Sequence, residues 1–363
     1  MLTLSIYSPD KTTKYPIGIA DVGELKFSTV DQYGYATCSF TVARDPREFY
    51  EDIWVTNVVI VGSGGQTVWE GEIVSTTGEV AEGASGITVE CLGYARQLSL
   101  HGTCNAVGPG KASAYIVSKI VPDCGFVAGS IYTSDFNFPY VVKAAGELGM
   151  YDEVMKSLNA PNGYGYGVWE DKKFSFYPYS STLAYIIDAR ECKYTMAYDL
   201  DSIYNRYCLT WTDNDDVKHA QWYPTGGADP ESMGLYGYRA KGLDISGKAS
   251  EEQALACAAK ALNREKRMRP KSSFVTHNIY SASTGKELDP TTVRAGNMIH
   301  VSNIHKGMLT PSQQLIMNEL STFRLAETEY DAVTGELTLS PGDIGTGLEK
   351  MLARLEARTK PNG

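Results

Sequence analysis

The sequence predicts an α+β protein that is mainly β, and three observations support that class. The first hundred residues contain short stretches in which apolar and polar residues alternate, which is the period of a half-buried strand. Residues 101–195 add apolar residues at helical spacing to further strand-like segments. Strand-like segments then return and continue to about residue 345. Many short strands separated by frequent turns are typical of an antiparallel barrel or sandwich.

The composition is that of a globular protein, and it argues against several classes of partner. The 363 residues are enough for two or three domains, each with its own core. With 43 acidic and 33 basic side chains, the formal net charge is −10, which argues against wrapping nucleic acid or binding anionic membranes. No apolar run approaches the ~20 residues of a membrane span, and no signal peptide is visible. The seven scattered cysteines are expected to be free thiols.

Residues 1–100 are predicted to form the first β-barrel domain. The clearest alternation lies at 36–42. Two further strands, at 54–61 and 66–74, are joined by a glycine-rich turn, because glycine adopts positive φ without steric cost. A last strand is expected at 87–91.

Residues 101–195 are predicted to form an α+β insert domain. Apolar residues at helical spacing predict helices over 111–121 and 151–158. Two aromatic strands, at 166–169 and 174–177, flank a polar turn, which predicts a hairpin.

The remaining chain is divided between a second β-barrel domain and a second insert. The second β-barrel domain is placed at 196–245 and 290–345, and 213–249 is expected to be a long connection with little regular structure. The helix-plus-strand insert at 246–289 begins with a capping box at Ser250 and an alanine-rich helix.

An internal repeat connects the two ends of the chain. Asp45 precedes a proline and is followed, nine residues on, by a strand-like segment starting at Trp54. Asp289 also precedes a proline and is followed at the same distance by a segment starting at Met298. Asp-Pro before a strand is also common turn chemistry, so the repeat suggests rather than requires that one β fold is used twice.

No motif for catalysis, a cofactor or a metal is found. Residues 108–113 are similar to a phosphate-binding loop but lack its first glycine and the hydroxyl residue after Lys111, so a turn and helix start is the favoured interpretation. The G-x-S-x-G and H-E-x-x-H patterns are absent. His300 and His305 do not share a metal-facing side of a helix. We therefore expect no enzyme activity and no cofactor.

Three other groups have a structural interpretation beside a functional one. Asp213 and Asp216 could ligate calcium, but without the glycine and distal glutamate of a calcium loop they favour a solvated turn. Glu70 and Glu72 share one strand face and are expected to be rim or lumen charges. The glycine-aromatic run at 163–169 could stack sugars, although packing of a hairpin is favoured.

The C-terminal segment, 346–363, is predicted to form an amphipathic helix and tail. Its apolar side chains recur at helical spacing: Leu348, Met351, Leu352 and Leu355. A helix this short does not persist alone, so these four residues must pack on their own subunit, on a neighbouring subunit or on a spike protein. They are the candidate oligomer or partner site.

The order and spacing of these segments resemble the hub proteins of bacteriophage tail tips and baseplates, which also occur in contractile injection machines. The resemblance covers nearly the whole chain, and no single motif is diagnostic. The matching segments are YATCSFTVAR, VVIVGSGGQTVWEGEIV, ITVECLGYARQL, YDEVMKSLNAPNGYGYGVWEDKKFSFYP, NRYCLTWT, SEEQALACAAKALNREKRMRP, VRAGNMIHVSNI and FRLAETEYDAVTGELTLSPG.

The resemblance implies a homotrimer in which each chain contributes two related antiparallel β-barrels, so that three chains form a pseudo-sixfold ring. Such a ring docks onto the hexameric tail tube or a distal tail adaptor and carries a spike or central fibre. Its axial channel admits the tape measure protein and, transiently, DNA. The protein would belong to the virion, assembled in the host bacterial cytoplasm, and this chain is not expected to bind membranes. We further expect acidic side chains to line the channel and repel phosphate.

Two alternatives remain. The 24 tyrosines and five tryptophans suit a module that binds host-wall carbohydrate during adsorption. A tail-associated peptidoglycan hydrolase would instead need a cleft with paired carboxylates or a metal triad.

Overall fold

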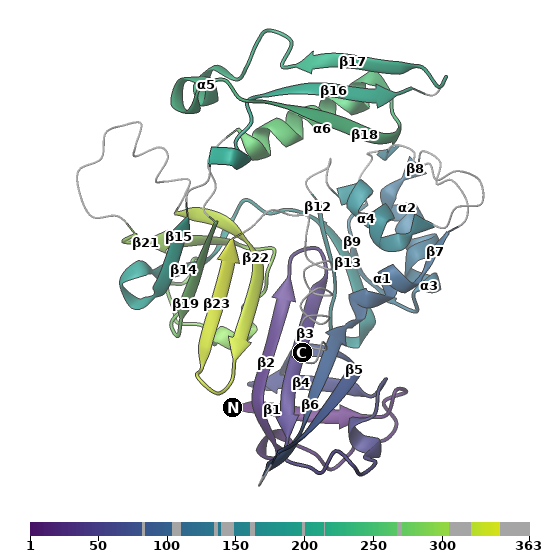
Figure 1. Ribbon diagram of the computed structural model, residues 1–363, viewed down its shortest axis with the longest axis vertical. Coiled ribbons are helices and arrows are strands. Elements are labelled where there is room, and N and C mark those ends of the chain that lie inside the picture. The colour runs from purple at the N-terminus through teal and green to yellow at the C-terminus, as the bar shows by residue number, and fades with distance from the viewer. Residues whose placement is uncertain are drawn as a thin grey trace.

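The computed structural model describes most of the chain, namely residues 1–81, 84–103, 110–133, 137–138, 149–159, 164–197, 200–213, 215–266, 271–304 and 321–341. Within these residues the fold is dominated by one 16-stranded sheet, accompanied by three small sheets and short helices. The predicted α+β, mainly β class is therefore confirmed. The large sheet curls into two halves that lie side by side, one built from the N-terminal strands and the other from strands of the middle and C-terminal parts of the chain (Figure 1). No helix in the described ranges is long and apolar enough to cross a membrane.

The first half-barrel contains six strands from the N-terminal part of the chain. In sheet order they are β1 (Leu2–Tyr7), β4 (Val58–Ser63), β5 (Gln66–Ala81), β6 (Ala84–Gly93), β3 (Gly34–Val42) and β2 (Val22–Val30). Every neighbouring pair in this order is antiparallel. Alternate residues along each strand point inward, so Cys38, Phe40 and Trp69 are buried in one core. The short helices η1 (Ile19–Asp21), η2 (Glu51–Ile53), η3 (Tyr94–Arg96) and α1 (Gln97–Leu100) connect or follow these strands.

The insert domain follows and packs beside the first half-barrel. Its elements are β7 (Gly102–Thr103), β8 (Gly110–Lys111), α2 (Ala112–Tyr115), η4 (Ile116–Ile120), α3 (Val121–Asp123), β9 (Val127–Ile131), β10 (Asn137–Phe138), β11 (Gly149–Met150), α4 (Tyr151–Asn159), β12 (Tyr164–Val168), η5 (Glu170–Lys172) and β13 (Lys173–Pro178). The predicted hairpin is present as β12 and β13, and the predicted helices are present in the described residues. The hairpin joins the large sheet where Val168 pairs with Gly34. Gly34 has a φ of 83°, and a Cβ there would overlap the Val168 carbonyl.

The second half-barrel is built from strands on both sides of another inserted unit. In sheet order they are β14 (Leu183–Asp188), β21 (Met298–Ser302), β22 (Thr322–Asp331), β23 (Glu336–Pro341), β19 (Lys271–Thr276) and β15 (Lys193–Ala197). The short strand β20 (Tyr280–Ser281) pairs with β14 on its outer edge. The turns η6 (Ala189–Glu191), η7 (Leu200–Ser202) and η8 (Pro290–Thr292) lie between these elements. Phe274, Ile299 and Leu325 belong to the buried core of this half.

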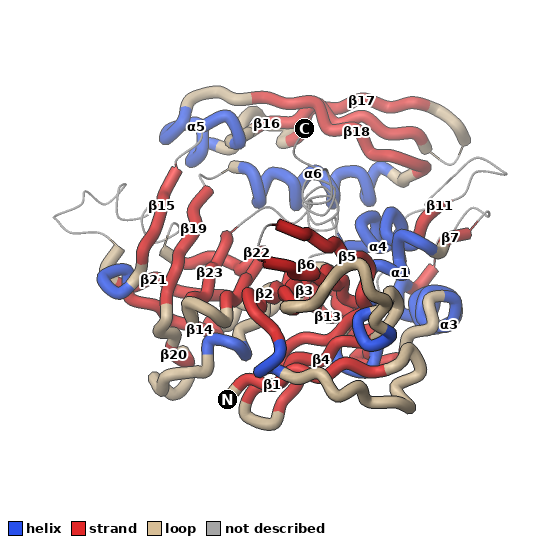
Figure 2. Tube along the Cα trace, turned by 60° about the horizontal axis from the view of Figure 1, so that its bottom comes forward, coloured by secondary structure: helices blue, strands red, loops and turns tan. Residues whose placement is uncertain are grey.

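A separate small unit lies above the two half-barrels in Figure 1. It comprises β16 (Arg206–Thr212), β17 (Lys218–Tyr223), α5 (Pro230–Tyr236), β18 (Ala240–Lys248) and α6 (Glu251–Glu265). Figure 2 shows α6 against the face of the three-stranded sheet that looks toward the rest of the chain. Leu209 and Trp211 alternate along β16 and pack there against Ala254 and Ala258 of the alanine-rich helix.

The strand pairing corrects two predictions about this part of the chain. Residues 196–245 were expected to belong to the second barrel. Among the described residues of this range, the end of β15 does pair with that sheet, but β16, β17 and β18 form a separate three-stranded sheet. The second half-barrel instead takes β14 and β15 from the predicted insert at 101–195. The segment 213–249 was expected to be irregular, yet it contains β17, α5 and β18. The proline at 230 begins α5, whose cap is the Asp229 side chain accepting from the Ser232 amide, so this proline marks a helix start.

The two half-barrels have the same strand order, as the internal repeat suggested. The spatial order β1-β4-β5-β6-β3-β2 in the first half corresponds to β14-β21-β22-β23-β19-β15 in the second. Corresponding strands also follow one another in the same order along the chain. Both long central strands carry a bulge at the matching place, at Val74 in β5 and at Ala326 in β22. One pair differs, since β1 and β4 are antiparallel whereas β14 and β21 are parallel.

Aligning the two bulges fixes the register of the repeat. Val58 is opposite Glu72, two residues before the first bulge, and Met298 is opposite Arg324, two residues before the second. Val58 therefore corresponds to Met298, whereas the sequence repeat had matched Met298 with Trp54. The predicted strands correspond, but the predicted register is wrong, because the loop after Asp45 is longer than the loop after Asp289.

Candidate functional site

The two half-barrels form one continuous sheet through a joint between β2 and β22. These strands are antiparallel, with Lys26 opposite Asp331 and Val30 opposite Glu327. The β2–β3 turn also reaches across, where the Asp31 amide donates to the Ala326 carbonyl at 2.8 Å. A strand from the beginning of the chain thus completes a sheet made by its end.

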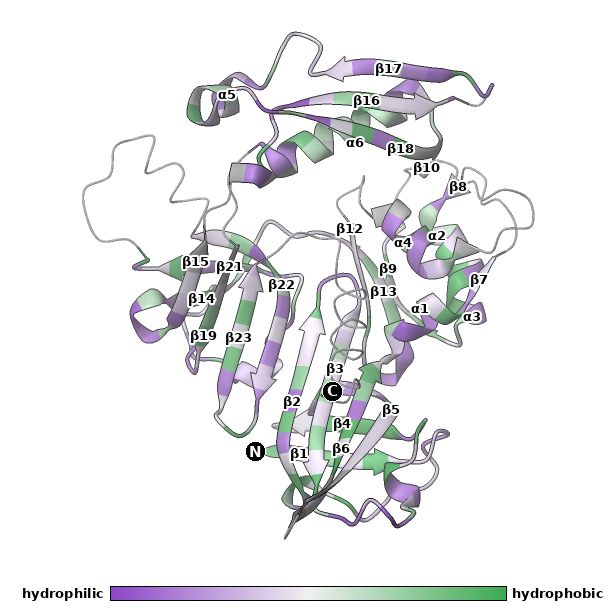
Figure 3. Ribbon diagram, viewed as in Figure 1, coloured by the Kyte–Doolittle hydropathy of each residue, from purple (hydrophilic) through white to green (hydrophobic). Residues whose placement is uncertain are grey.

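The continuous sheet has one apolar and one polar face. Residues directly opposite each other on neighbouring strands share a face. One such row across seven strands is apolar except for its last member: Ile73, Cys91, Cys38, Phe27, Tyr330, Leu337 and Thr276. The adjacent row on the other face is entirely polar: Ser75, Glu90, Ser39, Lys26, Asp331 and Glu336. The alternation is visible along β2, β22 and β23 in Figure 3.

We define the polar face as this second row and its neighbours beyond the two bulges. The neighbours are Ser28, Thr41, Thr77, Thr88, Lys193, Ser273, Val275, Glu327, Glu329, Thr338 and Ser340. Among these described residues, five carboxylates outnumber two lysines, and most of the others carry hydroxyl groups. Before the bulges the same face is covered by the insert domain, where Glu72 meets Lys172 and Arg324 lies over the Tyr179 ring.

Both lysines of the polar face are already engaged by its acids. Lys26 Nζ lies 2.9 Å from an oxygen of Asp331, and Lys193 Nζ lies 2.7 Å from an oxygen of Glu336. Burial is the largest single influence on Asp331 and would raise its pKa, but the hydrogen bonds from Lys26 and from the amides of Thr334 and Val333, together with the charge of Lys26, lower the pKa below its usual value. The hydrogen bond from Lys193 lowers the pKa of Glu336. The face is therefore net negative at neutral pH.

Buried hydroxyl groups hold the joint on its apolar side. Thr29 of β2 and Thr328 of β22 share a hydrogen bond of 2.7 Å between their side-chain oxygens. The Ala295 amide donates to the Thr29 hydroxyl at 2.8 Å, also out of solvent. A further contact between the half-barrels is made where β4 ends: the Ser63 hydroxyl donates to the Asp289 carboxylate, just before η8, at 2.6 Å. These contacts fix how one half-barrel lies against the other.

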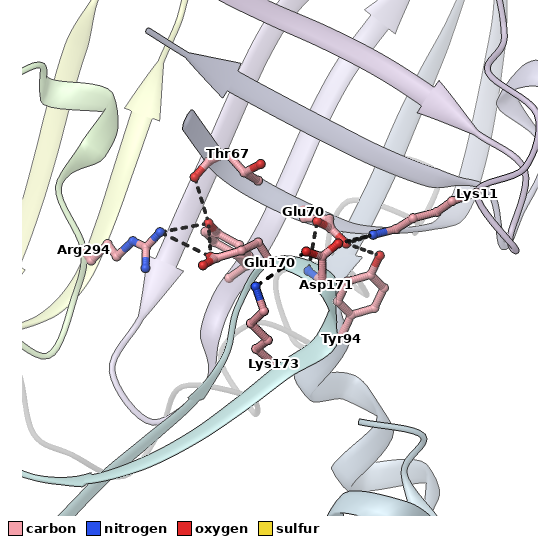
Figure 4. A network of polar contacts seen from close by, with 9 residues as sticks. Lys11, Thr67, Glu70, Tyr94, Glu170, Asp171, Lys173 and Arg294 are labelled. Atoms are coloured by element: carbon pink, nitrogen blue, oxygen red, sulfur yellow. Dashed lines mark hydrogen bonds and ion pairs between the residues drawn. The ribbon is translucent and has the colours of Figure 1, made fainter. Parts of the chain in front are cut away.

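Arg294 connects three parts of the chain at the same joint. Its guanidinium donates to the Tyr35 hydroxyl at 3.2 Å and to a Glu170 oxygen at 3.4 Å, and it lies 4.5 Å from the centre of a Trp169 ring. Tyr35 belongs to β3, and Trp169 and Glu170 belong to the β12–β13 turn. Arg294 reaches Glu170 from the second half-barrel (Figure 4). The insert domain is thereby tied to both half-barrels.

Glu70 is the centre of a second polar network beside it, which corrects its expected place on a rim or lumen. Its side chain is only 1% exposed. The carboxylate accepts from Lys11 Nζ at 2.7 Å, from the Tyr94 hydroxyl at 2.7 Å and from the Asp171 amide at 3.2 Å (Figure 4). The β12–β13 turn covers this strand face, and no local pattern in β5 revealed that cover. Its neighbour Glu72 is paired with Lys172 at 3.3 Å.

Asp31 is a buried acid at the turn between β2 and β3, with 6% exposure. A Cβ on Gly296 would lie 3.1 Å from its Oδ1 atom, so the second half-barrel closes over it. Burial raises the pKa of Asp31 to about 6, against the attraction of Arg324. The joint thus encloses an acid that is costly to ionise.

The other candidate residues do not come together. Tyr166 and Val168 lie on β12 and are fully buried in the core that this strand shares with the insert helices. The aromatic run therefore packs as a hairpin. Asp213 accepts from the amides of residues 215 and 217 in the β16–β17 turn, as expected of a turn. His300 meets the Thr322 hydroxyl on β22. Over the described ranges, no group of three potential metal ligands occurs.

Some predicted sites lie outside the described residues. These are His305, the first part of the 108–113 loop and the C-terminal helix with Leu348, Met351, Leu352 and Leu355. Of the loop, Gly110 and Lys111 lie in β8 and α2 begins at Ala112, in agreement with a helix start.

The joint itself was not found by sequence reasoning. Asp31, Thr29 and Arg294 are single polar residues in otherwise ordinary segments, and their partners lie more than a hundred residues away. The only signal was the internal repeat, which identified the two sheets but not the edges where they meet.

Comparison with known proteins addresses the fold. Neither a protein-family model nor a curated protein matches the sequence. The 43 kDa tail protein of prophage MuSo2 from Shewanella oneidensis matches with a TM-score of 0.64 at 12% identity, covering 94% of this chain and 98% of that one. The tail protein from Neisseria meningitidis MC58 matches with a TM-score of 0.62 at 14% identity, covering 95% and 98%.

A third match comes from a secretion machine. The E. coli c3393 protein, described as a component of the type VI secretion system with structural similarity to the T4 bacteriophage tail proteins gp27 and gp5, has a TM-score of 0.51 at 11% identity. That match covers 94% of this chain and 77% of the other. This chain therefore has the fold of bacteriophage tail proteins, as the resemblance predicted.

Proposed function

We propose that this protein is the structural hub of a bacteriophage tail tip or baseplate. Three copies would form a ring in which six half-barrels surround an axial channel. The observation that carries the proposal is the shared strand order of the two half-barrels, joined edge to edge through β2 and β22. A trimer of such chains presents six similar surfaces, and can therefore bind a sixfold tail tube or distal adaptor while offering threefold symmetry to a spike or central fibre.

The joint supports this role because a ring requires a fixed angle between its units. The hydroxyl pair of Thr29 and Thr328, the ion pair of Lys26 with Asp331 and the Arg294 contacts restrain that angle from both faces of the sheet. Each contact is modest alone, and together they restrain rotation about the joint. The work of the protein is then geometric, and no bond is broken.

The polar face would line the channel. Its hydroxyl groups and excess carboxylates offer DNA and the tape measure protein little apolar surface, and its two lysines are paired with acids. Repulsion between carboxylates and phosphates acts over roughly 8 Å at physiological ionic strength, which is effective inside a narrow channel. DNA would pass through this channel only during ejection, and the protein would reside in the virion after assembly in the host cytoplasm.

The alternatives receive no specific support from the described residues. A sugar platform at 163–169 would need exposed aromatic rings, and Tyr166 is buried there. The carboxylate pair Glu70 and Glu72 offers a hydrolase no free acid or base, because Lys11 and Tyr94 bond to Glu70 and Lys172 pairs with Glu72. The predicted C-terminal helix with Leu348, Met351, Leu352 and Leu355 is the proposed contact to a neighbouring subunit or spike.

Native mass spectrometry of the purified chain, alone and with the neighbouring tail proteins, tests the proposal. The expected result is a complex that contains three copies of this chain. A complex containing one, two or six copies would contradict the ring. Deleting residues 346–363 should weaken trimer formation or spike attachment, and an unchanged particle would remove the proposed role of that helix.

A further inference from the structure

Two of the open strand edges of the continuous sheet correspond to the two sides of the joint and have no strand partner in the described residues. The first edge belongs to the second part of β5. The backbone of Ile73 still bonds to Thr56 and Asn57 on the β4 side, and beyond Ile73 the strand β5 pairs with β6 on one side only. The second edge belongs to β15, which pairs with β19 on one side only. Open strand edges present a row of backbone donors and acceptors and readily accept another strand.

The repeat relates these two edges to the joint already formed inside the chain. In that joint, β2 pairs with the part of β22 that follows its bulge. The strand that corresponds to β2 is β15. The part of β22 after its bulge corresponds to the part of β5 after its own bulge, which is open. Each chain therefore contains one completed joint and the two separate halves of a second one.

We infer that β15 of one copy pairs in antiparallel fashion with the second part of β5 in the next copy. The inference rests on the proposed ring, which supplies the neighbouring copies. Three joints inside chains and three between chains would then connect the sheets of all three copies into a closed ring around the channel. Contacts of this head-to-tail kind generate closed rings when the rotation returns to its start.

The same correspondence predicts the register of the new joint. Lys26 lies opposite Ser39 in the first half-barrel, and Thr195 lies opposite Ser273 in the second. Counting from the bulges, Ser39 corresponds to Ser273, so Thr195 takes the place of Lys26. By the same count Glu79 takes the place of Asp331, the partner of Lys26. Thr195 is therefore expected opposite Glu79 of the neighbouring copy.

The two edges are accessible and their chemistry suits this pairing. On β15, Lys193 and Thr195 are exposed, and Tyr194 is 45% exposed despite stacking on the core residue Phe274. On β5, the residues from Thr76 to Gly78 are exposed. An aromatic ring at an open edge loses solvent contact when a strand is added, which favours the addition.

Paired cysteines test the register directly. The double variant Thr195→Cys with Glu79→Cys is expected to give covalent dimers and trimers on a non-reducing gel after mild oxidation, and neither single variant should. The matched control replaces Glu79→Cys by Thr76→Cys, which lies on the other face of β5 and should not cross-link. A trimer by native mass spectrometry in which the first pair fails and the control pair links would overturn the inference while leaving the hub intact.

Hydrogen exchange on the unmodified chain provides a second test that needs no variant. Within 194–197 and 76–80, the amides that point away from β19 and β6 should exchange about tenfold or more slowly in the trimer than in the monomer, because only these amides gain hydrogen-bond partners. Unchanged exchange at both edges, in a sample shown to be trimeric, would contradict the inference. If no trimer forms under any condition, the proposed function fails with it.

Discussion

Glu70 shows how one buried side chain can hold several parts of the molecule together. It lies on β5, while its three donors come from the loop after β1, from the segment after β6 and from the β12–β13 turn. An ionised carboxylate is retained in a protein interior only when its partners compensate for lost hydration. The residue therefore contributes to stability only as part of a complete network.

Substituting Glu70→Gln should lower the free energy of unfolding by about 2 to 4 kcal/mol, because Lys11 is left without its buried counter-charge. The matched control is Glu72→Gln, two residues along the same strand face, whose partly exposed pair with Lys172 should be worth no more than ~1 kcal/mol. Chemical denaturation of both variants checks the difference. Equal losses would show that the burial of Glu70 has no energetic role.

Asp31 gives the joint a pH dependence whose sign follows from its pKa. Its pKa is about 6 in the folded protein, above the usual 3.8, so folding favours the protonated form. Its contribution to stability is therefore complete at low pH and is lost as the pH rises from about 4 through 6. Asp31→Asn should raise stability at pH 7 to 8 by up to ~3 kcal/mol.

The gain from Asp31→Asn should shrink as the pH falls toward 4. Thermal denaturation between pH 4 and 8 measures the difference in stability between the Asp31→Asn variant and the unmodified protein. Asp215→Asn, in the exposed β16–β17 turn, is the control. A stability difference that does not change with pH would show that Asp31 ionises normally.

Strands β2 and β22 are the elements that turn two half-barrels into one sheet. Their contact is made by backbone pairing, by the Thr29–Thr328 hydroxyl pair and by the rings of Phe27 and Tyr330, whose centres are 5.4 Å apart. Since the strands come from opposite ends of the chain, neither half-barrel can be displaced without breaking this joint.

Replacing Thr328→Val should therefore cost about 1 to 2 kcal/mol, because a buried hydroxyl that bonds across the joint is removed. The same change on the polar face, Thr338→Val, should stay within ~0.5 kcal/mol. Urea denaturation of the two variants measures the difference. If Thr338→Val is the more costly change, the joint does not depend on the hydroxyl pair.

The sequence allowed several elements to be predicted, and the physical reason is locality. The strand at 36–42, the aromatic hairpin and the alanine-rich helix each carry their period or cap within a few residues. The second half-barrel was harder, because its first two strands are separated from the rest by the β16–β18 unit. Segments with exposed faces, such as β17, lack the apolar alternation on which prediction depends.

The joint and its residues could not be predicted because they depend on pairing between distant edges. Lys26 and Asp331 are 305 positions apart, and nothing in either segment specifies the partner. The sequence repeat did indicate that a second copy of the β fold exists. It misplaced the register, since only the bulges at Val74 and Ala326 align the two sheets correctly.

At the scale of the whole molecule, the polar face is the surface that a channel would use. Its carboxylates belong to both half-barrels, so a ring would carry them all around its inner wall. Glu327 and Glu329 lie on β22, close to the joint. Reversing their charges would create a cationic band facing the passage.

The double variant Glu327→Lys with Glu329→Lys should slow DNA ejection from assembled particles, and added salt should reverse the effect because it screens phosphate binding. The control is Glu48→Lys with Glu287→Lys, which changes the net charge equally at exposed positions off the polar face. Ejection can be followed by the fluorescence of a DNA dye. Equal rates for both variants would contradict a channel lined by the polar face.

The central claim is that two sibling half-barrels let a threefold assembly match a sixfold partner. A cryo-electron microscopy reconstruction of this chain bound to its tail partners tests it most directly. The account predicts three copies around one axis, with six half-barrels at near-equal angles and the polar face toward the channel. A map with another copy number, or with the half-barrels of one chain at unequal distances from the axis, would contradict it.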